Sequence, residues 1–107
     1  MGEKSVAIQG FVSAYQKNVH FRKHGGEFPF ATADDYEAEA VAFFVCNKPK
    51  TMVDCTRTGG DYLLYDKANN KLGVCAKDGT LRSFFRPDKR KHHMKDHMRY
   101  FRKTCKE

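Results

Sequence analysis

The chain has 107 residues, of which 40% are hydrophobic and 13% aromatic, a composition typical of one domain with a single core. It excludes an intrinsically disordered chain, and no stretch approaches the ~20 consecutive apolar residues that span a bilayer. Twenty Lys and Arg against 13 Asp and Glu give a formal net charge of +7, with the excess concentrated after Pro87. This asymmetry favours a polyanionic partner, most simply nucleic acid, although a merely solvated basic tail is the alternative.

The first part of the chain, residues 5–46, is predicted to be helical. Apolar side chains recur at helical spacing in its first half: Ile8, Phe11, Val12, Tyr15 and Val19. This spacing predicts a helix over residues 5–22 with Ser5 as its N-cap. The glycine pair that follows is expected to end the helix by taking left-handed conformations, which glycine adopts without steric cost. Lys23 and His24 then fall on the last helical turn.

A second helix is predicted to begin at the sequence TADD. Thr32 supplies an N-cap hydroxyl, and Asp34 and Asp35 place negative charge in the first turn, where the helix dipole favours it. The apolar positions at helical spacing are Tyr36, Ala40, Val41, Phe43 and Phe44. Pro49 in NKPK is expected to end this helix because proline cannot continue the backbone hydrogen-bonding pattern.

From residue 51 the pattern changes from helical to extended. Four short β-prone runs, TMVDCTR, YLLYD, KLGVCA and TLRSFFR, are separated by the turn formers TGGD, KANN and KDG. Connections this short make neighbouring strands antiparallel, which predicts a four-stranded meander over residues 51–86.

The last part of the chain, residues 88–105, is predicted to form a basic amphipathic helix. Its narrow apolar stripe consists of Met94, Met98, Phe101 and Cys105. The expected fold of the single domain, residues 1–107, is therefore α+β. Two N-terminal helices pack on one face of a four-stranded antiparallel meander, and a basic C-terminal helix follows.

The four cysteines form no CxxC pair, which makes a zinc knuckle or ribbon a weak interpretation. Cys46, Cys55 and Cys75 lie in apolar segments and are interpreted as buried free thiols. The sequence leaves disulfide pairing open, with a reducing cytoplasm as the favoured place of action.

The sheet face that the helices leave open is expected to present the functional groups. The first strand and its turn bring Thr56 and Arg57, and the second strand brings Tyr65. In TLRSFFRP, period-two alternation predicts one side made of Leu81, Ser83 and Phe85. The same alternation predicts another side made of Arg82, Phe84 and Arg86. Either side offers hydroxyl or guanidinium groups, and aromatic surface on which bases could stack.

A ribonuclease that works without a metal needs few groups. One group takes a proton from the ribose 2′-OH, another protonates the leaving 5′-oxygen, and a cation or hydroxyl stabilises the charge that grows on the phosphate. His24 suits the proton transfer because the unperturbed pKa of imidazole is ~6.5. Arg57 and the hydroxyl of Ser83 suit the phosphate. The simpler alternatives are a helix-capping histidine, a solvated turn arginine and a surface hydroxyl.

A histidine cluster near the end of the chain suggests a metal site as a competing interpretation. His93 and His97 are one helical turn apart and His92 is adjacent, but Asp96 is the only acidic residue close to them in sequence. These histidines are more simply explained as part of a cationic helix face that meets phosphate. No metal and no cofactor is expected.

The sequence also resembles a known group of bacterial toxins. The segments FRKHGGEF, TADDYEAEA and GGDYLLYDKANNKLGVCAKDGTLRSFFRPD follow one another in residues 21–88. They resemble the C-terminal nuclease domains of polymorphic toxins, including those of contact-dependent growth inhibition. The run from YLLYD to FFRP resembles the strand–turn–strand signature of these toxins, whereas the upstream KHG motif is more selective.

This resemblance implies a fold of the barnase, colicin and RelE group and a ribonuclease activity, often directed at tRNA. It implies a cognate immunity protein as partner, delivery by a larger secreted toxin, and action in the cytoplasm of a target bacterium. The KHG histidine corresponds to His24 and the arginine before the GD turn to Arg57. The small hydroxyl before FFxP corresponds to Ser83, where threonine is usual. The basic segment after Pro87 is longer than the resemblance leads us to expect.

The leading hypothesis is a metal-independent ribonuclease toxin domain acting on tRNA. His24, Arg57 and Ser83 would be catalytic, with His24 as general acid or base. Side chains expected to bind or steer the RNA are Lys23, Thr56, Tyr65, Arg82 and Arg86. The alternatives are a non-catalytic nucleic-acid-binding module that uses the basic C-terminal helix, and an interaction domain for an acidic partner protein.

Overall fold

The computed structural model of the chain describes residues 8–29, 32–45, 52–88 and 96–106. Its helices are α1 (Ala14–His24), the 3₁₀ helix η1 (Gly25–Glu27), α2 (Ala33–Val45) and α4 (His97–Lys106). Its strands are β1 (Gly10–Phe11), β2 (Met52–Thr56), β3 (Tyr62–Asp66), β4 (Lys71–Cys75) and β5 (Thr80–Phe85). The fold is α+β, which confirms the predicted class. No helix of the described residues is long and apolar enough to cross a membrane.

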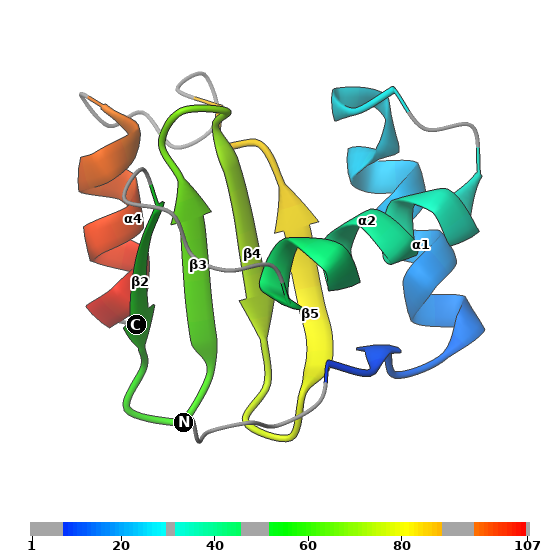
Figure 1. Ribbon diagram of the computed structural model, residues 1–107, viewed down its shortest axis with the longest axis horizontal. Coiled ribbons are helices and arrows are strands. Elements are labelled where there is room, and N and C mark those ends of the chain that lie inside the picture. The colour runs from blue at the N-terminus through cyan, green and yellow to red at the C-terminus, as the bar shows by residue number, and fades with distance from the viewer. Residues whose placement is uncertain (1–7, 30–31, 46–51, 89–95, 107) are drawn as a thin grey trace.

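The five strands form one mixed sheet in the order β1-β5-β4-β3-β2 (Figure 1). Strands β2 to β5 are antiparallel neighbours, which confirms the predicted meander. Strand β1 pairs in parallel with β5, with Phe11 opposite Leu81. This short edge strand was not predicted, and it makes the sheet mixed rather than purely antiparallel.

The start of the first helix differs from the prediction of a helix over residues 5–22. Helix α1 begins only at Ala14, and its N-cap is Ser13, whose hydroxyl accepts a hydrogen bond from the backbone of Gln16 at 3.1 Å. The preceding residues are extended because Gly10 has a φ of +90° and because the Phe11 amide donates to the carboxylate of Glu37 at 2.9 Å. The predicted helical stripe therefore does not form, and its members Val12 and Tyr15 are exposed.

The end of α1 at His24 agrees with the prediction, but its geometry does not. Gly25 has a φ of −59°, in the right-handed helical region, and the chain continues into η1 instead of turning left-handed. The need for glycine at this position is steric, because an added Cβ would lie 2.6 Å from the ring of Phe21. The tight turn of η1 brings Glu27 back beside His24.

Helix α2 begins as predicted. The hydroxyl of Thr32 accepts a hydrogen bond from the backbone of Asp35 at 3.1 Å, which confirms the N-cap. Tyr36 and Ala40 of the predicted apolar stripe are fully buried, and Phe43 is nearly so. The predicted helix end at NKPK lies outside the described residues.

Helices cover the sheet on both faces. Helices α1 and α2 lie near β5, and α4 lies by β2 at the far edge of the sheet (Figure 1). The core between the N-terminal helices and the sheet is built from Phe11, Phe28, Tyr36, Ala40, Phe43, Leu64, Cys75, Leu81 and Phe84. A second core lies on the other face and consists of Leu63, Tyr65, Leu72, Val74 and Phe101.

The expectation that helices pack on only one face is therefore wrong for α4. Neighbouring residues such as Leu63 and Leu64 are both buried, so β3 is apolar on both faces and each face needs a cover. A disulfide between Cys55 of β2 and Cys105 of α4 fastens this second cover. The interpretation of Cys55 as a free thiol is thus wrong, whereas Cys75 is a buried free thiol as expected.

A β-bulge in β5 changes which side chains face the second side of the sheet. Cys75 pairs with Leu81 and Val74 with Ser83, so that Arg82 is an extra residue in β5. Leu81 consequently joins the first core, while Ser83 lies on the opposite face. The predicted strict alternation, with Leu81 and Ser83 on one side, is wrong because the bulge shifts the pattern by one residue.

Candidate active site

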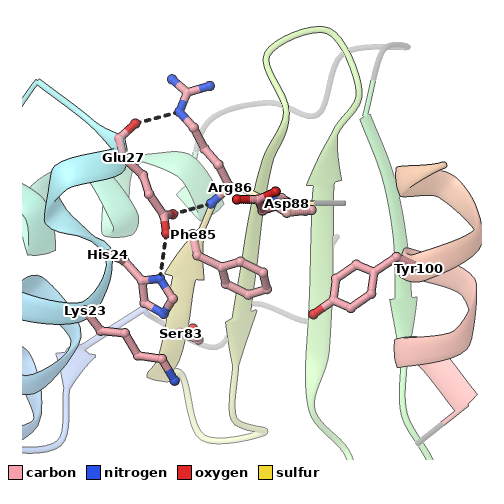
Figure 2. Close-up of a pocket in the computed structure, with 9 residues that line it drawn as sticks. Lys23, His24, Glu27, Ser83, Phe85, Arg86, Asp88 and Tyr100 are labelled. Atoms are coloured by element: carbon pink, nitrogen blue, oxygen red, sulfur yellow. Dashed lines mark hydrogen bonds and ion pairs between the residues drawn. The ribbon is translucent and has the colours of Figure 1, made fainter. Parts of the chain in front are cut away.

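A hollow of about 330 Å³ opens between the C-terminal end of α1 and helix α4, with β5 as its floor (Figure 2). It is lined by Lys23, His24, Glu27, Ser83, Phe85, Arg86, Pro87, Asp88 and Tyr100. We call it the histidine pocket. Besides His24, its lining contains three side chains that the sequence analysis proposed for binding or catalysis: Lys23, Ser83 and Arg86.

The imidazole of His24 is paired with a carboxylate. Its Nδ1 lies 3.1 Å from Oε2 of Glu27, and the other carboxylate oxygen accepts the backbone N–H of Arg86 at 2.7 Å. In the neutral ring Nδ1–H donates to Glu27, which leaves the lone pair on Nε2. The carboxylate also stabilises the imidazolium that forms when Nε2 takes a proton. His24 is thus oriented and polarised for proton transfer at one defined nitrogen.

His24 also belongs to a row of stacked rings. The ring centroids of His20 and Phe85 lie 6.2 Å and 5.3 Å from that of His24, and Phe11 continues the row beyond His20. Burial lowers the pKa of His20, and electrostatic interaction with His24 and Lys23 lowers it further, which favours the neutral form of its imidazole. The stacking fixes the plane of the catalytic candidate and leaves its edges for polar contacts.

Arg86 fastens the end of β5 to η1. Its Nε donates to the carbonyl of Glu27 at 2.9 Å, its Nη1 donates to the carbonyl of Asn69 at 2.6 Å, and its guanidinium lies 5.0 Å from the ring centroid of Phe28. These contacts join the wall that contains His24 and Glu27 to the floor of the histidine pocket. The guanidinium of Arg86, which the sequence analysis expected to steer RNA, does line the pocket. Two of its N–H groups are already bonded to carbonyls of the protein.

Hydroxyl and ammonium groups line the same pocket as the imidazole. Figure 2 shows Lys23 and His24 reaching from α1 toward the strand that carries Ser83. Tyr100 reaches into the pocket from α4 on the opposite wall, with its hydroxyl inward (Figure 2). The pocket therefore combines an imidazole, a flexible cation and two hydroxyls, which suit an anionic group such as a phosphodiester, and Asp88 adds a carboxylate of opposite effect to the lining.

Arg57 lies in a neighbouring hollow of about 400 Å³. This second hollow is lined by Arg57, Val74, Arg82, Ser83, Phe85, Tyr100 and Thr104, and we call it the arginine pocket. Ser83, Phe85 and Tyr100 line both pockets, so the two are direct neighbours on this side of the sheet, and we refer to them together as the groove. The structure thus places Arg57 on the same side of the sheet as His24, at the other end of the groove rather than in the same pocket.

Arg57 is held by the helix that covers it. Its Nε donates to the carbonyl of Thr104 in α4 at 2.9 Å, and its Nη1 lies 3.6 Å from the carboxylate of Asp61. The expectation of a solvent-facing arginine beside the histidine is replaced by a partly buried arginine under α4.

Two of the predicted RNA-binding residues do not lie in the groove. Tyr65 is only 3% exposed, its ring stacks on Phe101, and its hydroxyl donates to Asn70 at 2.9 Å. The expectation that Tyr65 offers an open stacking surface is wrong because α4 covers it. Thr56 is exposed on β2 but lines neither pocket.

Sequence reasoning missed two residues of this site. Glu27 follows His24 by three positions, a spacing that places side chains on one side of a helical turn, and this signal could have identified the pair. Tyr100 gave no such signal, because its place depends on where α4 docks.

Of the histidine cluster, only His97 belongs to the part of the chain that the structure describes. Among those described residues, no three His, Cys, Asp or Glu side chains gather as a metal-binding group. His92 and His93 lie outside them.

No protein-family model matches the chain, and no curated protein shows detectable similarity to it.

Proposed function

We propose that the chain is a metal-independent endoribonuclease domain. The observation that carries this proposal is the His24–Glu27 pair, which aims an oriented imidazole at a pocket that also contains Lys23 and Ser83. RNA transesterification requires a group that transfers protons and groups that stabilise charge on the phosphate. A positioned imidazole next to cations and hydroxyls supplies both.

The reaction proposed here breaks one P–O bond and forms another. The ribose 2′-oxygen attacks the adjacent phosphorus and loses its proton, and the bond from phosphorus to the 5′-oxygen breaks. The leaving oxygen takes up a proton, so the products are a 2′,3′-cyclic phosphate and a 5′-hydroxyl. His24 transfers one of the two protons at Nε2, while Lys23 and the hydroxyl of Ser83 stabilise the negative charge on the phosphate oxygens.

The experiment that tests the proposal is incubation of the purified protein with total tRNA, with and without EDTA. We expect cleavage in both conditions, and its loss in H24Q. H97Q is the matched control, because His97 lies on another helix and lines neither pocket. Cleavage by H24Q at the parental rate would remove His24 from the mechanism. Cleavage that EDTA abolishes would overturn the metal independence.

The pH dependence of single-turnover cleavage identifies the role of His24. A general base must start unprotonated, so activity would rise with pH through the imidazole pKa; a general acid gives the opposite limb. E27Q keeps the shape of the glutamate but removes its charge, so we expect slower cleavage. Cleavage by E27Q at the parental rate would show that the charge of Glu27 takes no part in the reaction.

A second candidate function is nucleic-acid binding without cleavage. One helix presents the exposed cations Arg99, Arg102, Lys103 and Lys106. Their charge favours binding to phosphates with an affinity that falls steeply as salt rises. Salt-dependent binding of tRNA without any product would favour this candidate over the ribonuclease.

The biological setting is proposed from the resemblance to polymorphic toxins. We propose tRNA as the substrate class, a dedicated immunity protein as partner, delivery by a larger secreted protein and action in a target-cell cytoplasm. The disulfide between Cys55 and Cys105 supports a secreted stage, because such bonds persist mainly outside reducing compartments.

A further inference from the structure

The arginine pocket contains a pair of cations that share one carboxylate. Asp61 lies 2.9 Å from Nε of Arg82 and 3.6 Å from Nη1 of Arg57. Asp61 thus contacts both guanidinium groups, and Asp78 also interacts electrostatically with Arg82. Of the described residues that line the pocket, two are arginines and none is acidic, so guanidinium groups are the charged groups that face it.

The bulge in β5 is what presents Arg82 to the groove. As the extra residue of the strand, Arg82 leaves the regular alternation, and its side chain is 57% exposed. Only its Nε is used by Asp61, in a contact at the inner end of the guanidinium. The outer edge of this planar fork matches two oxygens of a phosphate group.

The boundary between the two pockets is aromatic. Phe85 and Tyr100 lie edge to face with their ring centroids 6.4 Å apart, and both line the histidine pocket and the arginine pocket. Aromatic side chains beside a cationic groove form the usual platform for single-stranded nucleic acid, because every base has a face that can stack. A sugar and base would occupy this boundary, with a phosphate on either side.

We propose that the arginine pocket binds a second phosphate of the RNA, next to the phosphate that reacts at His24. This inference rests on the proposed ribonuclease function and deepens it. The substrate is then an oligonucleotide with at least two consecutive phosphates across the groove, and a dinucleotide with one phosphate fills only the histidine pocket.

The test uses DNA oligomers with a single ribonucleotide, so that only one bond can be cut. The shortest substrate is a dinucleotide with one phosphate, and two trinucleotides extend it by one deoxynucleotide on the 5′ or the 3′ side. We expect one of the two trinucleotides to have a kcat/KM at least about tenfold above that of the dinucleotide, since it gains a charge-assisted contact.

Variants connect this gain to the arginine pocket. In R82Q we expect the ratio of kcat/KM for the longer substrate to kcat/KM for the dinucleotide to fall about tenfold, because only the longer substrate reaches the arginine pocket. K67Q removes the same charge from an exposed turn residue that lines neither pocket, and it should retain the full advantage. Arg82 is preferred to Arg57 for this test because Arg57 also bonds to the backbone of α4.

Equal kcat/KM for all three substrates, or equal losses in R82Q and K67Q, would overturn the second phosphate site. Binding of all-deoxy oligomers, which cannot be cut, separates this proposal from the ribonuclease proposal. Tighter binding of the trinucleotide than of the dinucleotide, lost in R82Q alone, would support the site even if no RNA were cleaved. Equal binding of both oligomers would refute it.

Discussion

The disulfide between Cys55 and Cys105 is expected to supply a large share of the stability of the domain. It joins the last turn of α4 to β2 across 50 residues of sequence. The chain-entropy relation gives about 4 kcal/mol at 25 °C for a loop of this length, because the unfolded chain loses that freedom when the loop is closed. Helix α4 has only ten residues, and Phe101 is its main buried apolar anchor, so few other contacts replace the bond.

The perturbation is the double substitution C55S/C105S, measured by urea unfolding at pH 7. We expect the free energy of unfolding to fall by about 4 kcal/mol. The melting temperature should fall by roughly 15–20 °C for a chain of this length. The m-value should rise, because the unfolded chain without the bond is less compact and exposes more surface.

The single variants provide an internal control. C55S and C105S each break the same bond, so each should lose nearly as much stability as the double variant, and their effects should not add. A loss below about 1 kcal/mol in the double variant would contradict the loop-entropy reasoning. It would mean that packing of α4 on the sheet holds the helix without help from the bond.

Three further perturbations test the packing around the site. Tyr36→Phe should lower the free energy of unfolding by about 1–2 kcal/mol in urea melts, because the buried hydroxyl of Tyr36 donates to the carbonyl of Phe84, and an unchanged midpoint would contradict this. Burial raises the pKa of the Cys75 thiol to about 11, so the folded protein keeps a proton that the unfolded chain loses. Stability should therefore fall between pH 9 and 11, and more steeply than in Cys75→Ala; parallel curves would refute the shift. Gly25→Ala should cost about 1–3 kcal/mol in the same melts, because the added methyl meets the ring of Phe21, and a neutral effect would show that the ring moves aside at little cost.

The parts of the fold that were predictable are those encoded within a few residues. The N-cap at Thr32 and the turn sequences between β2 and β5 located a helix and a meander correctly, because caps and tight turns depend on local chemistry. Strand β1 was not predictable in this way. It has only two residues, and its partner β5 lies far from it in the sequence, with Gly10 paired to Thr80. The pairing therefore depends on the tertiary fold.

The site was predictable only in part for the same reason. An imidazole beside cations pointed to His24, and the structure gives it the carboxylate of Glu27 as a partner. The position of Arg57 depends on α4, which covers the second face of the sheet. The apolar run in β3 indicates that both faces are covered, but it does not say which element covers the second one. The face on which Ser83 lies depends on a bulge at Arg82. Leu81, Phe84 and Phe85 are all apolar, so the sequence fits strict alternation from Leu81 to Phe85 as well as the bulged spacing from Leu81 to Phe84.

The hydrogen bonds between Glu27 and Arg86 have a consequence for the order in which the site forms during synthesis. The two residues are 59 positions apart, and both the backbone and the side chain of Arg86 donate hydrogen bonds to Glu27. A ribosome that has released the first helix has therefore produced His24 long before it produces the strand that anchors its carboxylate partner. Any chain that stops before β5, through premature termination or proteolysis, contains the imidazole without the rest of the groove. Under the proposed function, such a chain should not cleave RNA.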